Sequence, residues 1–263
     1  SKYNILGNSA TGSVFIFDKN DSKYISLTGS PSQFGYSIDL NNGQLIVGCS
    51  QQNYETASIF RKTTNWNLYK TIGYATSENK FWNSDNVGSS TMPLIIDENT
   101  YISGIPLANK NSSTSKTGIV ISCNFNTSWT NTTLDINGLT NARTANDLYG
   151  TSVALDSNFA IIGAPGHTTD SQGYNPGGSG SIFTYYFDNS TKSWNDETIL
   201  RPSGVSNFGY MVDVKFNTII GTTQPYRVSN NPVYIGKYSR SNNKWSLVNN
   251  PSSCQSSGLN SFS

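Results

Sequence analysis

Two aspartates come closest to a catalytic pattern in this 263-residue chain. Asp39 and Asp213 occupy the same position of two similar apolar segments, and Met92 and Ala154 stand at that position in two further segments. Hydrolysis of a glycosidic bond needs two carboxyl groups that flank the bond. The pair, with one further acid nearby, would be required for a divergent glycosidase, which is the weakest of three functional interpretations.

Other catalytic constellations are missing from the sequence. His167 is the only histidine, and it follows Pro165 and Gly166 with no serine or cysteine nucleophile motif around it. A catalytic triad needs a nucleophile, a base and a group that orients the base. The chain also has no phosphate-binding loop and no dinucleotide-binding fingerprint. We therefore expect no catalytic residues, no cofactor and no enzyme activity.

Metal ligands are equally sparse. Asp97 and Glu98 form the most acidic of the short turns, whereas calcium needs several oxygens from one loop. The three cysteines, Cys49, Cys123 and Cys254, have no metal-ligand neighbour at a useful spacing. We expect no metal site. An odd count leaves at least one thiol unpaired, and the pairing of the others stays open.

A repeated unit organises the chain. Residues 149–200 read as four strands: an aromatic-Gly opening, a tight turn, an apolar strand that ends in Gly-Ala-Pro, a third strand, and a tryptophan that introduces the fourth. Weaker copies precede and follow it, and internal repeats of this length indicate a propeller or solenoid. Because four of the five tryptophans share one position, we expect them to pack between units. These four are Trp66, Trp129, Trp194 and Trp245.

The unit resembles the FG-GAP repeat of integrin-α-like β-propellers. Tyr149-Gly150 with Gly163-Ala164-Pro165 carries the resemblance most clearly, and Phe34-Gly35 with Gly48-Cys49-Ser50 repeats it. The resemblance implies an all-β propeller over residues 1–263. Its repeats would be five four-stranded blades at residues 1–30 plus 259–263, 34–76, 87–146, 148–202 and 208–250.

The first blade begins at its second strand, so Leu259–Ser263 would supply the missing first strand and close the ring. Closure removes the exposed strand edges of an open sheet. FG-GAP propellers are usually seven-bladed, and part of a longer propeller is the alternative.

Composition excludes several partners. The net charge is +1, and no basic patch with interleaved aromatic residues suggests nucleic acid. No apolar run reaches the ~20 residues that span a bilayer, so we expect no direct membrane insertion. The high content of Asn, Ser, Thr, Gly and Tyr is typical of a β-rich surface protein. Five Asn-x-Ser/Thr triplets are candidate glycosylation sites and permit an extracellular or cell-surface location. They are Asn20, Asn111, Asn126, Asn131 and Asn189.

Loop lengths point to one face of the propeller. The turns between first and second strands are uniformly short, whereas the connections from second to third strands and between blades are long. Binding residues concentrate on loops held by a rigid scaffold, and in integrin-like propellers this face takes the ligand. The candidate ligand-binding residues on it are Tyr54, Trp82, His167, Tyr174, Tyr226 and Arg227.

These observations favour a binding or adhesion module that recognises a surface protein or a glycan through the long-loop face. The second interpretation is a structural subunit of an extracellular sheath, filament or appendage that associates with copies of itself. Loops that differ between blades favour one composite protein-binding face over repeated sugar sites.

Overall fold

The protein is a series of antiparallel sheets. The computed structural model describes residues 2–4, 10–17, 24–28, 34–35, 37–48, 57–72, 94–97, 100–106, 117–124, 130–133, 146–167, 179–202, 204–223, 235–242 and 244–248. Among these residues there is no helix long and apolar enough to cross a membrane.

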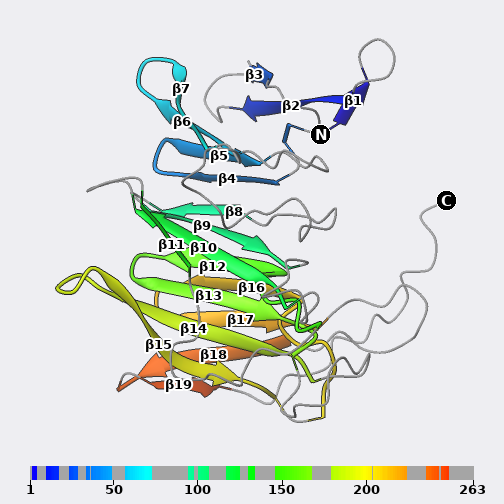
Figure 1. Ribbon diagram of the computed structural model, residues 1–263, viewed down its shortest axis with the longest axis vertical. Helices are drawn as coiled ribbons and strands as arrows, with labels where there is room; N and C mark the ends of the chain where they lie inside the picture. Colours follow the sequence, from blue (N-terminus) through cyan, green and yellow to red (C-terminus); the bar gives the residue numbers. More distant parts are fainter. Residues whose placement is uncertain are drawn as a thin grey trace.

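Five sheets follow one another along the chain (Figure 1), and we call them blades 1 to 5 in chain order. Blade 1 contains β1 (Lys2–Asn4), β2 (Ala10–Phe17) and β3 (Tyr24–Thr28). Blade 2 contains β4 (Ser37–Asn41), β5 (Gln44–Gly48), β6 (Ala57–Lys62) and β7 (Trp66–Ile72). Blade 3 contains β8 (Leu94–Asp97), β9 (Thr100–Ile105), β10 (Ile119–Asn124) and β11 (Thr130–Thr133).

Blade 4 contains β12 (Ser152–Asp156), β13 (Phe159–Ala164), β14 (Ser181–Asp188) and β15 (Ser193–Leu200). Blade 5 contains β16 (Met211–Lys215), β17 (Thr218–Thr222), β18 (Ile235–Ser241) and β19 (Lys244–Leu247). In blades 2 to 5 the strands pair in chain order, each antiparallel to the next. The first strands β4, β8, β12 and β16 contact one another in sequence, so they form the inner edge of the stack.

This arrangement confirms the predicted all-β fold of four-stranded units. The predicted strand from residues 259–263 lies outside the described residues. Ring closure and the number of blades therefore stay predictions.

The hydrophobic core lies between the sheets rather than inside any one of them. Residues of blades 3 and 4 form one cluster, with Ile102 and Val120 packed against Tyr149, Val153 and Leu155. A second cluster joins blades 4 and 5, and a third joins blades 1 and 2. Alternating side chains of each strand point to opposite faces of the sheet, so each blade has two faces to cover. The burial of blade 4 on both faces explains why its β13 and β14 are apolar almost throughout.

The aromatic-Gly openings join each blade to the one before it. The amides of Tyr149 and Phe208 donate to the carbonyls of Thr117 and Ser179 in the preceding blades, at 3.1 and 3.0 Å. The glycine after each aromatic residue has φ near 90°, which glycine adopts without steric cost. A Cβ atom on Gly163 would lie 2.0 Å from the carbonyl oxygen of Gly209 in the next blade. The repeated residues therefore allow close backbone contact between neighbouring blades.

The shared tryptophan position packs between blades, as predicted. Trp194 donates through Nε1 to Ser122 of blade 3 at 3.0 Å, and Trp245 donates to Glu197 of blade 4 at 2.8 Å. Trp66 packs against a cluster that includes Val14 of blade 1. Trp129 and Trp82 lie outside the described residues.

Candidate functional site

The connections between strands differ in length at the two ends of the molecule. Two-residue turns join the first two strands of blades 2 to 5, as the pairs Asn41 with Gln44 and Asp156 with Phe159 illustrate. We call the end that carries these turns the plain face. The opposite end receives residues 49–56, 106–118, 165–180 and 223–234 between second and third strands, and the connections between blades. We call it the long-loop face. The predicted difference between short and long connections is confirmed.

A buried hydrogen-bonded pair lies at the base of residues 165–180, the longest connection between second and third strands on the long-loop face. His167 Nδ1 donates to Asp147 Oδ2 at 3.0 Å, and the two side chains are 4% and 0% exposed. The backbone continues the connection, since the amide of Gly166 donates to the carbonyl of Asp147 and that of Gly180 to the carbonyl of His167. The two ends of the loop at 168–179 are therefore fixed to blade 4.

This burial corrects the expectation that His167 lies on an exposed loop. Its ring packs edge-on against Phe183, with centroids 5.2 Å apart. A histidine enclosed by a carboxylate and an aromatic ring positions the loop and does not itself reach a ligand on the surface. The partner Asp147 lies twenty residues earlier in the chain, and no local sequence pattern identifies it.

A second polar contact lies at the same end of blade 4. Arg201 Nε donates to Ser181 Oγ at 2.9 Å. Burial lowers the pKa of Arg201, and the negative charge of Asp147 opposes that shift. Because a free arginine titrates far above neutral pH, Arg201 keeps its charge and balances that of Asp147. Hydrogen bonds of Asp147 and Arg201 thus fix the ends of the strands of blade 4 on the long-loop face.

The remaining predicted ligand-binding residues are on loops that the structure leaves undescribed. Tyr54, Trp82, Tyr174, Tyr226 and Arg227 all lie outside the described residues, as do Asn20, Asn111 and Asn126. Asn131 falls in β11. Asn189 is exposed in the turn between β14 and β15, and its Nδ2 donates to Asn158 Oδ1 at 3.2 Å. That candidate glycosylation site is on the plain face.

Asp39 and Asp213 lie on first strands that are not neighbours in the stack. Asp39 of β4 pairs with Ile46 of β5, and Asp213 of β16 pairs with Ile220 of β17. The two aspartates therefore share one register position. The strands β8 and β12 lie between β4 and β16 (Figure 1). The register also assigns Ile95, rather than Met92, to this position of blade 3. Among the described residues no three His, Cys, Asp or Glu side chains gather into a group that could hold a metal ion.

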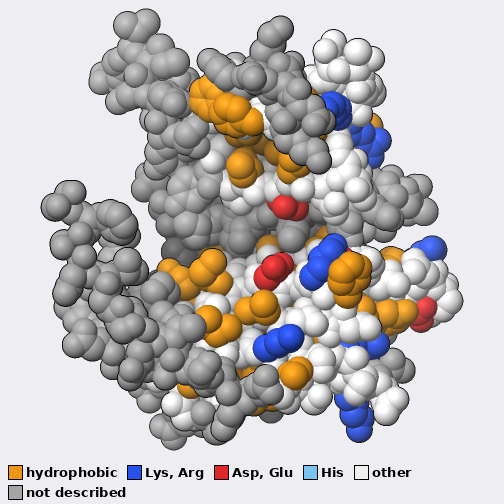
Figure 2. All heavy atoms as spheres, turned by 180° about the vertical axis from the view of Figure 1, so that it is seen from behind, with side chains coloured by type: hydrophobic (Ala, Val, Ile, Leu, Met, Phe, Trp, Pro, Cys, Tyr) orange, Lys and Arg blue, Asp and Glu red, His pale blue; other side chains and the backbone are white. Residues whose placement is uncertain are grey.

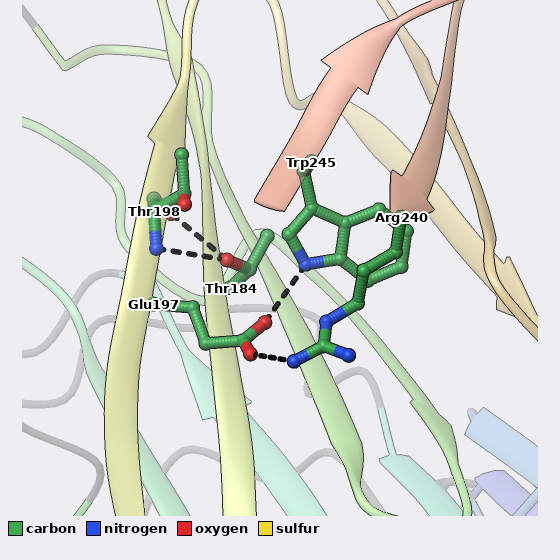
Figure 3. Close-up of polar contacts among 5 residues, drawn as sticks. All are labelled: Thr184, Glu197, Thr198, Arg240 and Trp245. Carbon is green, nitrogen blue, oxygen red and sulfur yellow. Dashed lines mark hydrogen bonds and ion pairs between the residues drawn. The ribbon is translucent and has the colours of Figure 1, made fainter. Parts of the chain in front are cut away.

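A charged cluster fills the boundary between blades 4 and 5 (Figure 3). Glu197 accepts from Arg240 Nη2 at 2.6 Å and from Trp245 Nε1 at 2.8 Å. The side chains of Glu197 and Arg240 are only 11% and 15% exposed. The guanidinium of Arg240 also lies 4.8 Å from the ring centroid of Phe159, within the range of a cation–π contact. Sequence reasoning had identified Trp245 and neither of its charged partners.

A cavity of about 240 Å³ lies beside this cluster and is lined by β14 and β15. The register of β14 and β15 shifts between Thr184 and Tyr185, which both line the cavity. The Thr184 hydroxyl donates to the Thr198 carbonyl and accepts from the Thr198 amide, both at 3.0 Å. The lining includes the carboxylates of Asp196 and Glu197. Because Glu197 is already bound by Arg240 and Trp245, this boundary holds blades together and offers no unoccupied acid pair.

Comparison with known proteins identifies the repeat from which blade 4 is built and identifies no activity. Residues 143–185 match the FG-GAP repeat. This segment covers the aromatic-Gly opening, β12, β13 and the start of β14, which confirms the resemblance drawn from Tyr149-Gly150 and Gly163-Ala164-Pro165. Together with the sheet order it identifies the fold as a β-propeller. A search of curated proteins by sequence returned no match.

Several solved structures are similar at low identity. The β-propeller domain of the Trilobed protease from Pyrococcus furiosus shares 10% identity over 82% of this chain, with a TM-score of 0.41. An endo-arabinanase from Bacillus licheniformis shares 12% identity over 76% of this chain and 70% of its own, with a TM-score of 0.38. The cobalt-substituted Synechocystis ACO shares 8% over 80% of this chain and 46% of its own, with a TM-score of 0.36. The chain spans 57% of the length of the protease domain structure. No substrate or activity of these proteins is assigned to this chain.

Proposed function

We propose that this protein is a non-enzymatic, extracellular or cell-surface binding module that recognises a protein or glycan through its long-loop face. The observation that supports this proposal is the way blade 4 holds its longest loop. The Asp147–His167 pair is buried and hydrogen-bonded at 3.0 Å at the loop base. A buried pair at this place can fix a recognition loop, and ordering a loop before binding lowers the entropic cost of association.

The chemistry of the loops fits recognition of a polar partner. The connections on this face carry tyrosines, asparagines and serines, together with Trp82 and Arg227. Tyrosine and tryptophan supply large rigid contact areas, and asparagine and serine supply adaptable hydrogen bonds. The FG-GAP repeat is typical of extracellular proteins and supports the same location. Each blade carries a different loop, which favours a single composite site for a protein partner.

Paired variants test the proposal. The protein would be assayed against a glycan array and a panel of purified surface proteins, and the tightest ligand taken forward to measure Kd. Replacing Tyr174, Tyr226 and Arg227 together by alanine should weaken binding at least about tenfold, the effect expected when one interface hot spot is lost. Phe216→Ala on the plain face is the matched control and should leave Kd unchanged. The reverse pattern would contradict the proposal.

One observation favours the second candidate, a structural subunit that associates through the plain face. Phe216 at the turn between β16 and β17 is 77% exposed and has φ of 52°. A bulky residue at positive φ is strained, and the other first turns have Asn42, Glu98 and Ser157 at this position. Asp156 of blade 4 fixes the turn by accepting from Lys215 Nζ at 3.0 Å and from the Phe216 amide. An assembly contact at this face would explain a fixed, exposed aromatic side chain.

The two candidates predict different behaviour on concentration. A subunit of an assembly should sediment as progressively larger species as its concentration rises, and Phe216→Ala should abolish this. A binding module should keep one mass over the same range, with and without that substitution. Sedimentation velocity at several concentrations distinguishes them.

A further inference from the structure

A row of polar side chains crosses blade 2 at its plain-face end. Directly paired residues of antiparallel strands project from the same face of a sheet. Four residues form the row, because each pairs with the next on the neighbouring strand: Asn41, Gln44, Arg61 and Asn67. The row at this register position of blade 4 is Asp156, Phe159, Tyr186 and Asn195. Blade 2 thus carries an amide and a guanidinium at the two positions where blade 4 carries aromatic rings.

The guanidinium of Arg61 is held on an aromatic ring. Its central carbon lies 3.6 Å from the ring centroid of Tyr69, well within the range of a cation–π contact. Tyr69 is the extra residue at the point where the register of β6 and β7 shifts. The Nε atom of Arg61 is buried without a hydrogen-bond partner, and no carboxylate among the described residues forms an ion pair with this arginine. Arg61 therefore has a fixed plane and donors that no described acceptor uses.

Arg240 shows what a comparable arginine binds in this protein. Its guanidinium lies 4.8 Å from the ring centroid of Phe159 and donates to the Glu197 carboxylate at 2.6 Å. The planar fork of a guanidinium matches the geometry of a carboxylate, and hydrogen bonds between the two charged groups are strong. Arg61 thus has the aromatic support that Arg240 has and lacks its carboxylate.

The surface around Arg61 is positively charged. Residues 57–72, which form β6, β7 and their turn, contain Arg61, Lys62 and Lys70 and no acidic residue. Figure 2 shows Lys and Arg side chains at the upper right, near the β6–β7 turn, where no described acidic side chain adjoins them. By contrast, residues 181–200 of blade 4 contain three acidic residues and one lysine. Positive charge of this kind favours association with an anionic partner.

We propose that this row binds a carboxylated glycan, in which the carboxylate of a uronic acid contacts Arg61 and sugar hydroxyls contact the neighbouring amides. Amide side chains offer both donors and acceptors, as recognition of hydroxyl groups requires. The amide of Asn67 is already oriented, because its Nδ2 donates to Thr63 Oγ1 at 3.1 Å and to the Asn65 carbonyl at 3.0 Å. Its Oδ1 therefore points away from the turn, where a sugar hydroxyl can donate to it.

An extended acidic peptide is the rival partner for a basic surface beside an edge strand. β7 is the last strand of its sheet, so such a peptide would pair with its outer edge. A register shift and a lysine on an edge strand both oppose that kind of pairing, and β7 has the shift at Tyr69 and a lysine directly after it. The edge thus favours a ligand that contacts side chains rather than backbone. This site is on the plain face and does not depend on the proposed binding function of the long-loop face.

Isothermal titration calorimetry with hexagalacturonate as the probe tests the proposal. We expect saturable binding, and Arg61→Gln should weaken it at least about tenfold because charge-assisted hydrogen bonds are lost. Arg61→Lys should weaken it too, since lysine keeps the charge and lacks the planar fork. Lys244→Gln, at an exposed position on the plain face of blade 5, removes the same charge and should leave Kd unchanged. In NMR spectra the side-chain amide signals of Gln44 and Asn67 should shift during the titration.

Absence of saturable hexagalacturonate binding would overturn the proposal. Equal losses of affinity in Arg61→Gln and Lys244→Gln would also overturn it, because attraction by overall charge would then explain the binding. Tighter binding of hexaglutamate than of hexagalacturonate would replace the glycan by an acidic protein partner.

Two controls keep the outcome specific. Far-UV circular dichroism establishes that the variants keep their sheet content, and Arg61→Lys replaces Arg61→Gln, with the same expected direction, if the latter does not fold. Joint replacement of Tyr174, Tyr226 and Arg227 by alanine should leave the Kd for hexagalacturonate unchanged. A loss of affinity in that triple variant would place the glycan on the long-loop face and contradict the assignment to blade 2.

Discussion

Blades 4 and 5 have the same strand order and differ in what lies against them. Blade 4 is covered on both faces, and cross-strand neighbours Ala154, Ile161 and Thr184 pack toward blade 5. By strand register, the equivalent neighbours in blade 5 are Asp213, Ile220 and Lys237, and all three are exposed. The face of blade 4 that packs against blade 5 thus carries small and apolar residues. The equivalent face of blade 5, against which no described blade packs, carries two charged residues.

The same difference holds for the backbone contact. Gly163 pairs with Ser152, and the residue at that register position of blade 5 is Thr222, which pairs with Met211. A side chain at Gly163 would collide with Gly209 of blade 5, whereas Thr222 meets no following aromatic-Gly opening among the described residues. The comparison indicates that the glycine of the repeat is required where a strand contacts the backbone of the next blade. Residues 143–185, which match the FG-GAP repeat, belong to the blade that packs against a described blade on each of its two faces.

Gly163→Val should lower the free energy of unfolding more than any other substitution considered for these two blades. Its Cβ would lie 2.0 Å from the Gly209 carbonyl oxygen and 2.3 Å from Ser152 Oγ, so the interface must separate. We expect a loss of about 3 kcal/mol or more in the free energy of unfolding, as for severe overpacking. Thr222→Val, the matched change in blade 5, should cost under about 1 kcal/mol. Urea denaturation measures both, and equal losses would contradict the interface account.

Glu197→Ala should have the next largest effect. It leaves Arg240 and the Trp245 indole without their acceptor at a boundary where both ion-pair partners are largely buried. Removal of one partner of such a pair leaves an uncompensated charge, and we expect a loss of about 2–3 kcal/mol. Lys237→Ala, on the exposed face of blade 5, should change the free energy of unfolding by under about 0.5 kcal/mol. A small effect of Glu197→Ala in thermal unfolding would show that the boundary between blades 4 and 5 is solvated.

A single hydrogen bond between blades 3 and 4 gives a smaller and sharper test. Trp194→Phe removes the indole donor and Ser122→Ala removes its acceptor at 3.0 Å. A double-mutant cycle should give a coupling energy of about 1 kcal/mol, the usual net value of one hydrogen bond. Additive losses from the two substitutions would mean that the contact between Trp194 and Ser122 does not stabilise the folded protein.

The smallest effect is expected at a turn away from both interfaces. Hydrogen bonds from Ser190, through its side chain and then its amide, hold the pKa of Asp188 below its ordinary value. A lowered pKa favours the folded state at pH above the unfolded pKa, and this contribution is lost as pH falls through the folded pKa. Ser190→Ala should raise the Asp188 pKa toward its usual range, as carboxyl NMR titration would detect. An unchanged pKa would contradict the cause given.

The fold was predictable because its determinants are local and repeated. Alternating apolar residues, two-residue turns and the aromatic-Gly openings indicated four-stranded units, and the tryptophan position correctly indicated contacts between blades. The position of Asp213 in β16 was predicted correctly, whereas the glycine position of β17 was not. Ile219-Ile220-Gly221 is similar in sequence to Ile161-Ile162-Gly163, which would align Gly221 with Gly163, but the strand pairing aligns Thr222 with Gly163.

The candidate site was less predictable, since its contacts join distant residues. Neither Asp147 as the partner of His167 nor Glu197 as the acceptor for Arg240 follows from spacing in the sequence. His167 was placed with exposed loop residues because it follows Pro165-Gly166, and the structure buries it through Asp147 and Phe183. Long-range polar contacts depend on how blades stack, which a repeat pattern alone does not specify.

The most direct measurement is a structure of the protein isolated from its source with its neighbours retained. We predict that a partner protein or glycan contacts the long-loop face around residues 168–179, above the Asp147–His167 pair. Contacts made mainly through the plain face, with Phe216 inserted into another copy, would contradict the binding account and establish a structural subunit.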